Sequence, residues 1–393
     1  MQKIILLSSF FLFSICTYSQ DSIWLSKTKG KFPFLEYGIG DERLGGAKIG
    51  YLDSNVMLYI IDSFTTDYKV RLSANHTAYI AKESVSLLRK ESAIRPVHNP
   101  LLSGNMKVYG EGNLDFLVLS MPATLPYRSF QLVNPSRIIV DIFGMNANTN
   151  WIGQLKSIRE IRNIWYEQIE DDVFRITIEL KHAQHWGHAI YYDSTGRKLT
   201  VQVKRQPASL DIRKMKIAID PGHGGDNSGT SGVNHGILEK QYTLILAKEL
   251  EKVLRKAGVK DVFMTRTHDT SLSMAERLEM IRNYNPDFLV SIHLNSAASD
   301  TVQGVSTYYR YIGFRPLSVS ILNQMLSLGL KEYGNIGNFN FALNGPTDYP
   351  NALVEVAFLS NPEDEKKVNN PKFQKAVAQK IYLGMAGWLN ASR

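Results

Sequence analysis

The sequence predicts an α/β domain with a mostly parallel sheet flanked by helices, preceded by two small all-β domains. Beyond Pro207, short apolar strands alternate with helical patterns, which is typical of a parallel sheet covered on both faces. Before that point, short strand-like runs follow one another without a helical period. The 393 residues exceed what one hydrophobic core usually holds, so two or three domains are expected.

The first residues have the pattern of an export signal. Lys3 carries a positive charge, residues 4–15 are mostly apolar, and Thr17-Tyr18-Ser19 supplies small residues for cleavage. We therefore expect residues 1–19 to be a signal peptide. A transmembrane anchor is the weaker alternative because the apolar run is shorter than the ~20 residues that span a bilayer, so no stable membrane insertion is expected.

The cysteine content limits which residues can bind a metal, and the net charge limits which polymers the chain is expected to bind. The single cysteine, Cys16, lies inside the signal, so any metal in the mature chain must be held by His, Asp or Glu. Lipidation of Cys16 is disfavoured by the bulky Ile15 before it. A net charge of +8 suits an anionic polymer, and export favours a cell wall over nucleic acid.

The two expected β domains occupy residues 22–92 and 106–205. The first has short strand-like runs, such as residues 56–61 and 68–72, which suggest a small barrel. A linker with two prolines at residues 95–100 follows. The second has longer strand-like runs and suggests a β-sandwich; these runs are residues 116–119, 137–142, 174–180 and 198–203.

The α/β domain is expected over residues 213–393. Leu244, Ala247, Leu250 and Leu254 recur at helical spacing. A terminal amphipathic helix is predicted over residues 373–389. The short apolar segments that predict strands are residues 217–219, 262–264, 288–290 and 353–356.

Two histidines follow strands of this sheet. His223 lies in a Gly-rich turn after the first strand, and His293 follows the strand at 288–290. Glu239 stands between them where a helical pattern begins, a position that also suits a carboxylate without a metal. Two imidazoles and one carboxylate leave a position open for water, as in catalytic zinc sites. The rival ligands are His235, Asp220 and Asp226.

Glu355 is an acid inside an apolar strand. Burial of an unpaired carboxylate is costly, so such a residue is usually paired, bound to a metal or functional. Beside a zinc site it would act as a general base. The structural alternative is a salt bridge with Arg266 or Arg277.

Several motifs in order resemble the zinc-dependent N-acetylmuramoyl-L-alanine amidases over residues 214–391. They are Asp220 to Gly225, Glu239-Lys240, Thr265-Arg266, Ser291 to Asn295, and Leu353 to Pro362. Two departures are Ala357, where glycine is usual, and Leu294, where a small residue is common. The phrase Asn134 to Gly144 resembles the AMIN-type localisation domain, and residues 22–92 loosely resemble Src-homology-type barrels.

The resemblance implies that His223, Glu239 and His293 bind Zn²⁺ and that Glu355 is the general base. It implies hydrolysis of the bond between the muramyl lactyl group and L-alanine of peptidoglycan, in cell-wall remodelling or cell separation, by an exported and most simply periplasmic enzyme. The competing functions are a wall-binding protein with a degenerate catalytic domain and another exported zinc hydrolase, such as an endopeptidase or a polysaccharide deacetylase. Residues 22–205 are expected to target rather than catalyse.

The interval between His293 and Glu355 bears on regulation. Some relatives insert a blocking helix there, whereas this chain is expected to have a strand at 304–310, a core helix at 316–333 and a loop at 334–351. Little remains to form a plug, so an open site that needs no protein activator is expected. The alternative is a small lid in which Phe339 and Phe341 pack over the cleft.

Overall fold

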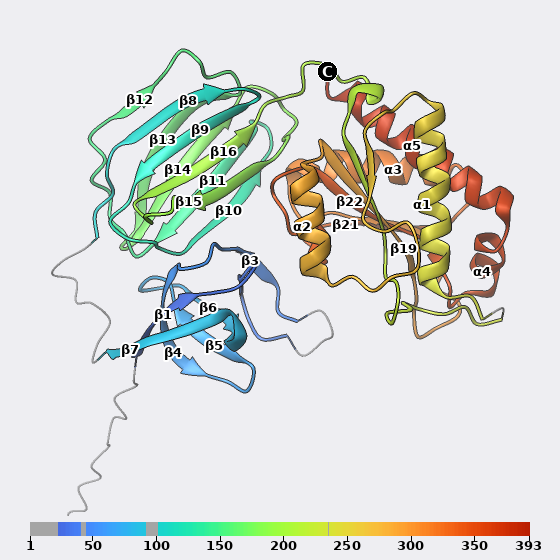
Figure 1. Cartoon of the computed structure of the whole chain (residues 1–393), viewed down its shortest axis with the longest axis horizontal. Coiled ribbons are helices and arrows are strands. Elements are labelled where there is room, and N and C mark those ends of the chain that lie inside the picture. The colour runs from blue at the N-terminus through green and yellow to red at the C-terminus, as the bar shows by residue number, and fades with distance from the viewer. Residues whose placement is uncertain (1–22, 41–44, 92–100, 235) are drawn as a thin grey trace, which may run out of the picture.

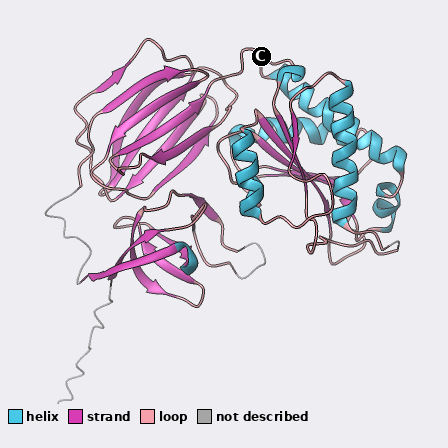
Figure 2. Cartoon of the chain, in the orientation of Figure 1, coloured by secondary structure: helices cyan, strands magenta, loops and turns pink. Residues whose placement is uncertain are grey.

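The computed structural model describes residues 23–40, 45–91, 101–234 and 236–393. The expected signal, the linker at 95–100 and His235 lie outside these residues. The expected fold class is confirmed: two all-β regions precede a domain of mixed helices and strands (Figures 1 and 2).

The first region is one antiparallel sheet of seven strands. Its elements are β1 (Ile23–Thr28), β2 (Phe34–Glu36), β3 (Lys48–Tyr51), β4 (Met57–Ser63), β5 (Asp67–Arg71), β6 (Thr77–Ala81), the 3₁₀ turn η1 (Lys82–Ser84) and β7 (Val85–Glu91). Alternate side chains such as Leu58 and Ile60 are buried, as expected for strands with one inner face. The order β3-β2-β6-β5-β4-β1-β7 places β3 and β7 at the edges of the sheet.

The second region is a sandwich of two sheets. Its strands are β8 (Met106–Glu111), β9 (Leu114–Ser120), β10 (Tyr127–Leu132), β11 (Arg137–Phe143), β12 (Ile152–Gln154), β13 (Ile161–Glu170), β14 (Val173–Leu180), β15 (His188–Tyr192) and β16 (Lys198–Lys204). One sheet has the order β10-β11-β14-β13 and the other β12-β8-β9-β16-β15. Leu117 of β9 and Val140 of β11 belong to one buried apolar cluster, which also includes Leu58 of the first region.

The third region has a six-stranded sheet in the order β18-β17-β19-β22-β20-β21. All neighbouring pairs are parallel except β20 with β22. The strands are β17 (Ile217–Pro221), β18 (Val262–Met264), β19 (Phe288–Asn295), β20 (Val305–Tyr308), β21 (Glu332–Ile336) and β22 (Asn351–Phe358). The helices are α1 (Glu239–Lys256), α2 (Met274–Tyr284), α3 (Arg315–Leu326), α4 (Pro362–Val368) and α5 (Pro371–Ala391), with short turns η2 (Ile212–Lys214), η3 (Ile312–Phe314) and η4 (Ala342–Asn344).

Helices cover both faces of this sheet. Ile217 and Ile219 of β17 face α1, α3 and α5, whereas Ala218 faces α2. Figure 1 shows α2 on the side toward the β regions and α1 on the other side. The alternation within one strand therefore gives the sheet two apolar faces, as its short apolar strands predicted.

The interval between His293 and Glu355 differs in part from expectation. The strand expected at 304–310 is found as β20, but the predicted core helix ends at Leu326. Gly329 has a φ of +75°, a left-handed conformation that ends helices readily. The chain then pairs with β20 as β21, so residues 332–336 form an edge strand partly inside the predicted loop. No plugging helix occurs among residues 294–354, all of which the structure describes.

Candidate metal centre

His223 leaves the sheet through a tight turn after β17. Its φ is +59°, which is uncommon for a residue with a side chain. A Cβ on Gly222 would lie 2.2 Å from the ring of His293, so only glycine fits between the two histidines. This close approach explains why the strand ends in Pro-Gly-His.

Two arginines hold the turn in place. The guanidinium of Arg277, on α2, donates to the carbonyl oxygens of Pro221 and His223. Arg266 donates to the carbonyl oxygens of Pro221 (3.0 Å) and Gly222 (2.9 Å). These bonds satisfy buried carbonyls that the turn removes from the sheet, and they offset the strained φ of His223.

Glu239 begins α1, as the helical pattern predicted. Its Oε2 accepts the backbone N–H of Thr230 at 2.9 Å, and its Oε1 accepts that of Leu294 at 3.1 Å. Oε1 also lies 3.1 Å from Nε2 of His223 and 3.0 Å from Nδ1 of His293. The carboxylate is thereby aimed at both imidazoles.

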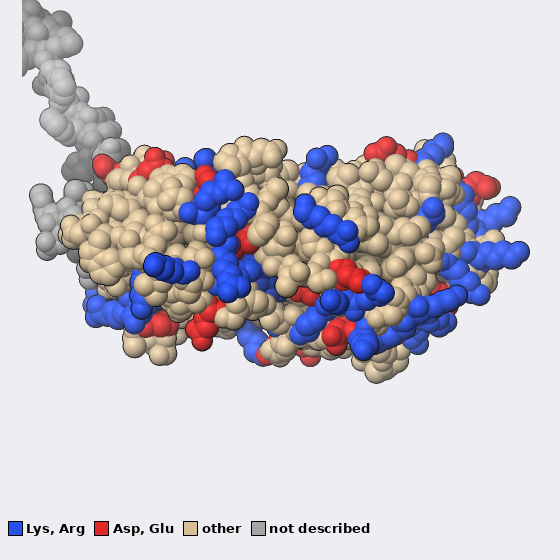
Figure 3. Space-filling model, turned by 90° about the horizontal axis from the view of Figure 1, so that it is seen from above, with Lys and Arg blue, Asp and Glu red and all other residues tan. Residues whose placement is uncertain are grey.

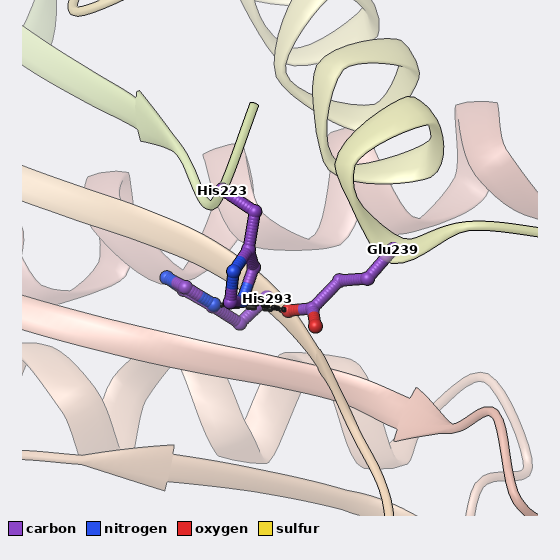
Figure 4. A group of neighbouring side chains, drawn as sticks. All are labelled: His223, Glu239 and His293. Carbon is purple, nitrogen blue, oxygen red and sulfur yellow. Dashed lines mark hydrogen bonds and ion pairs between the residues drawn. The ribbon is translucent and has the colours of Figure 1, made fainter. Parts of the chain in front are cut away.

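The three expected ligands converge on one point. One ligand atom from each of His223, Glu239 and His293 lies within 4.8 Å of the others, and Figure 4 shows the side chains pointing toward one another from a turn, a helix start and a strand. The donor set of two imidazoles and one carboxylate is that of catalytic zinc sites. The histidines keep 23% and 17% of their side-chain surface, so solvent reaches the point of convergence. The residues present therefore fit a zinc ion.

The charges of the three groups favour this arrangement. Burial alone raises the pKa of Glu239, but hydrogen bonds to both histidines bring it well below its ordinary value. Burial lowers the pKa of His223, and the hydrogen bond and charge of Glu239 raise it above its usual value. The carboxylate thus stays ionised, which is the state that a metal ligand requires.

Asn227 is a part of the site that the sequence did not reveal. Its Oδ1 lies 2.9 Å from Nδ1 of His223 and also accepts the N–H of Gly229 at 3.1 Å. A partner on Nδ1 orients the ring and leaves Nε2 free for a metal. An amide four residues after a histidine in a turn was the available signal, and it is common in turns without metals.

Glu355 lies beside His293 on the neighbouring strand. The two residues are register partners in the parallel pair β19 and β22. The Glu355 side chain is buried, and its Oε2 has no hydrogen-bond partner in the described part of the chain. Burial, and then the charge of Glu239, raises the pKa of this carboxyl well above its ordinary value.

The salt bridge considered for Glu355 is absent from the described residues. Arg277 pairs with Asp220 at 2.6 Å, and Arg266 donates mainly to backbone carbonyls. Both arginines are therefore used to build the turn before His223. Glu355 faces the cleft instead.

The rival ligands have other roles where the structure describes them. Asp220 is bonded to Arg277, Thr265 and Ser291. Asp226 accepts the hydroxyl of Ser271 at 3.1 Å. Neither belongs to the cluster of ligand atoms formed by the described residues.

A cleft of about 890 Å³ opens over the three convergent residues. One wall is aromatic: the Phe341 ring lies 6.3 Å from the His293 ring, centroid to centroid and nearly parallel, and 4.5 Å from the Phe339 ring. Tyr308 packs edge-on against both phenylalanines. Phe339 and Phe341, the residues of the alternative lid, thus line the cleft from one side.

Within the described residues, no helix is both long and apolar enough to cross a membrane.

Two family models match the chain. Residues 217–387 match the N-acetylmuramoyl-L-alanine amidase model, and residues 107–203 match the AMIN domain model. Among similar proteins, N-acetylmuramoyl-L-alanine amidase AmiC of Neisseria meningitidis serogroup B is 26% identical over 364 residues, covering 70% of this chain and 87% of that protein. AmiC of Escherichia coli O6:H1 is 26% identical over 350 residues, covering 67% and 84%.

A solved structure is also similar. The catalytic domain of CwlV, an N-acetylmuramoyl-L-alanine amidase from Bacillus (Paenibacillus) polymyxa, is 31% identical, with a TM-score of 0.43, and the match covers 44% of this chain and 97% of that domain. The two family matches fall on the third and second regions of the fold, in the order that the motifs predicted. Residues 217–387 therefore form a domain of the N-acetylmuramoyl-L-alanine amidase family, and residues 107–203 form an AMIN domain.

Proposed function

We propose that this chain is an exported zinc amidase that hydrolyses the amide bond between the muramyl lactyl group and L-alanine of peptidoglycan. The observation that carries the proposal is the unpaired, buried carboxylate of Glu355 beside the convergent His223, Glu239 and His293. The domain family supports the reaction, and the AMIN domain supports a place in the cell envelope.

The residues divide into a binding set and a reacting group. His223, Glu239 and His293 would hold the zinc. A zinc ion held there would lower the pKa of a water molecule and polarise the amide carbonyl. Among the described residues Oε2 of Glu355 has no hydrogen-bond partner, so this carboxylate would accept the proton of the attacking water and return it to the nitrogen of L-alanine.

The positive surface charge suits an anionic cell wall. The chain has 45 Lys and Arg against 37 Asp and Glu. Figure 3 shows the basic side chains spread over the sandwich end and the amidase end of one face, with acidic ones between them. A dispersed positive surface favours weak attraction to a polymer rather than a defined charge groove.

The competing functions predict other products. Mass analysis of purified peptidoglycan treated with the zinc-loaded chain should show intact stem peptides with a free L-alanine amine. Cleavage within the peptide would indicate an endopeptidase, and loss of acetyl groups without peptide release would indicate a deacetylase. The Glu355→Gln protein is the matched control. Binding to sacculi without any product would indicate a degenerate domain and contradict the proposal.

A further inference from the structure

The N-terminal sheet touches the segment that carries the aromatic wall of the cleft. Strand β3 is an edge strand, so its outer backbone groups have no neighbouring strand. The side-chain amide of Asn340 meets this edge: its Nδ2 donates to the carbonyl of Gly46 at 2.6 Å, and its Oδ1 accepts the N–H of Lys48 at 3.2 Å. The Asn340 side chain thus hydrogen-bonds to backbone groups at the start of this edge, where a neighbouring strand would otherwise pair.

Further contacts fix the same segment. Arg310 donates from Nη1 to Oδ1 of Asn340 at 3.0 Å and from Nη2 to the carbonyl of Lys48. The hydroxyl of Tyr51, on β3, lies 3.4 Å from the carbonyl of Ala342. Tyr51 also packs against the apolar cluster that contains Leu343. Polar and apolar contacts with the N-terminal sheet therefore hold residues 340–343 in place.

Residues 340–343 include Phe341, which forms the wall of the cleft beside the metal centre. Phe341 follows Asn340 directly, and its ring stacks near His293 and packs against Tyr308. Ala342 and Leu343 line the same cleft. The contacts of Asn340 with the N-terminal sheet therefore fix the position of Phe341, the next residue, in the cleft.

The connection between β21 and β22 depends on contacts with other parts of the chain for its conformation. Between β21 and β22 the chain forms only the single short turn η4, so backbone hydrogen bonds fix few of its residues. Fixing such residues costs conformational entropy, and segments with few internal bonds open at low free energy. The contacts with β3 supply the missing restraint. Phe341 then presents an apolar ring face suited to a sugar ring or an alanine methyl group.

We propose that the N-terminal β region completes the substrate cleft: β3 holds Asn340, and Asn340 positions Phe341 as the wall beside His293. Asn340 is thus a positioning residue that acts on substrate binding rather than on the chemical step. This inference rests on the proposed amidase function. It gives residues 23–91 a part in the cleft in addition to any targeting role.

The test uses the full zinc-loaded chain and a soluble muropeptide. Asn340→Ala removes the side-chain hydrogen bonds to Gly46, just before β3, to Lys48 at the start of β3, and to Arg310. We therefore expect KM to rise about five- to tenfold while kcat stays within about twofold. The zinc content should not change. Asn75→Ala is the matched control because Asn75 donates to Glu170 of the sandwich at 3.2 Å, across a boundary that does not touch the cleft. Its KM should equal that of the wild type.

A double-mutant cycle separates positioning from general stability. If Asn340 acts through Phe341, Asn340→Ala should have no further effect on KM in a Phe341→Ala background. An unchanged KM in the single variant, a fall confined to kcat, or full additivity in the double variant would overturn the inference. If Asn340→Ala does not fold, Asn340→Asp keeps the acceptor and loses the donor. Its KM should rise less, and an unchanged KM would again overturn the inference.

Hydrogen exchange distinguishes failure of this inference from failure of the proposed function. Peptides covering residues 337–345 should exchange faster in Asn340→Ala than in the wild type, whatever reaction the cleft performs. If the wild type releases no stem peptide, the amidase proposal fails and the exchange rates still test the restraint. Unchanged exchange would show that β3 does not hold the segment.

Discussion

Asp220 and Glu355 are both acids buried in the central sheet, and their surroundings are opposite. Asp220 lies in β17 with 1% of its surface exposed and is hydrogen-bonded to Arg277, Thr265 and Ser291. Glu355 lies in β22 with 6% exposed, and its Oε2 has no partner. One sheet thus holds one buried carboxylate with three side-chain partners and another whose Oε2 has none among the described residues.

The pKa values follow the partners. Burial tends to raise the pKa of Asp220, but the charge of Arg277 and the hydrogen bonds hold it below its ordinary value. Burial raises the pKa of Glu355, and the nearby Glu239 raises it further. A buried acid without a partner is therefore a stronger candidate for a functional role than a buried acid with partners.

The largest effect on stability is expected at the paired acid. Arg277→Met leaves Asp220 buried without its counter-ion, and it frees the carbonyl of His223. We expect a loss of about 3–5 kcal/mol in the free energy of unfolding, measured by denaturant titration. Arg282→Met is the control on the same helix, because its pair with Asp348 is partly exposed. It should cost less than about 1 kcal/mol. Equal losses of unfolding free energy in the two variants would show that the buried pair is no more important for stability than the partly exposed one.

A buried histidine at a domain boundary gives the next effect. His188 lies on β15, its N–H bonds to Thr347 of the amidase domain, and burial lowers its pKa to about 3. The unfolded chain therefore binds the proton first, so stability falls as pH drops below about 6.5. His188→Gln should remove about 2 kcal/mol of this loss at pH 5, measured as thermal stability against pH.

The smallest effect is expected at the unpaired acid in the metal-free protein. Because its folded pKa is raised, the folded state holds the proton more tightly, and Glu355 lowers stability as pH rises above about 4.5. Glu355→Gln should therefore stabilise the chelated protein by on the order of 1 kcal/mol at pH 7 and by nothing at pH 4. A gain that is the same at both pH values would show that the carboxylate is not penalised by burial.

The sequence was informative where local pattern determines structure. The turn at His223, the helix start at Glu239 and the strand with His293 were predictable because each motif sits at the end of an apolar run. Asn227 was not predictable because an asparagine four residues after a histidine is common in turns without metals. Asn340 was not predictable because its partners Gly46 and Lys48 are distant in sequence. The early end of α3 depended on Gly329, whose left-handed φ becomes evident only once β21 pairs with β20.

The contact of β3 with Asn340 shows the same limit on a larger scale. Hydrogen bonds between residues about 290 positions apart depend on how domains pack, and neither segment has a pattern that indicates the other. Domain classes were thus predictable from periodicity, whereas the wall of the cleft required the assembled fold.

The central claim is that His223, Glu239 and His293 bind the metal while the unpaired Glu355 performs proton transfer. The most direct test measures zinc content and stem-peptide release in Glu355→Gln beside His223→Ala. Glu355→Gln should keep one zinc per chain and lose about 10²–10⁴-fold in turnover, whereas His223→Ala should lose both zinc and turnover. Loss of zinc from Glu355→Gln would make Glu355 a ligand, and retained turnover would contradict the account.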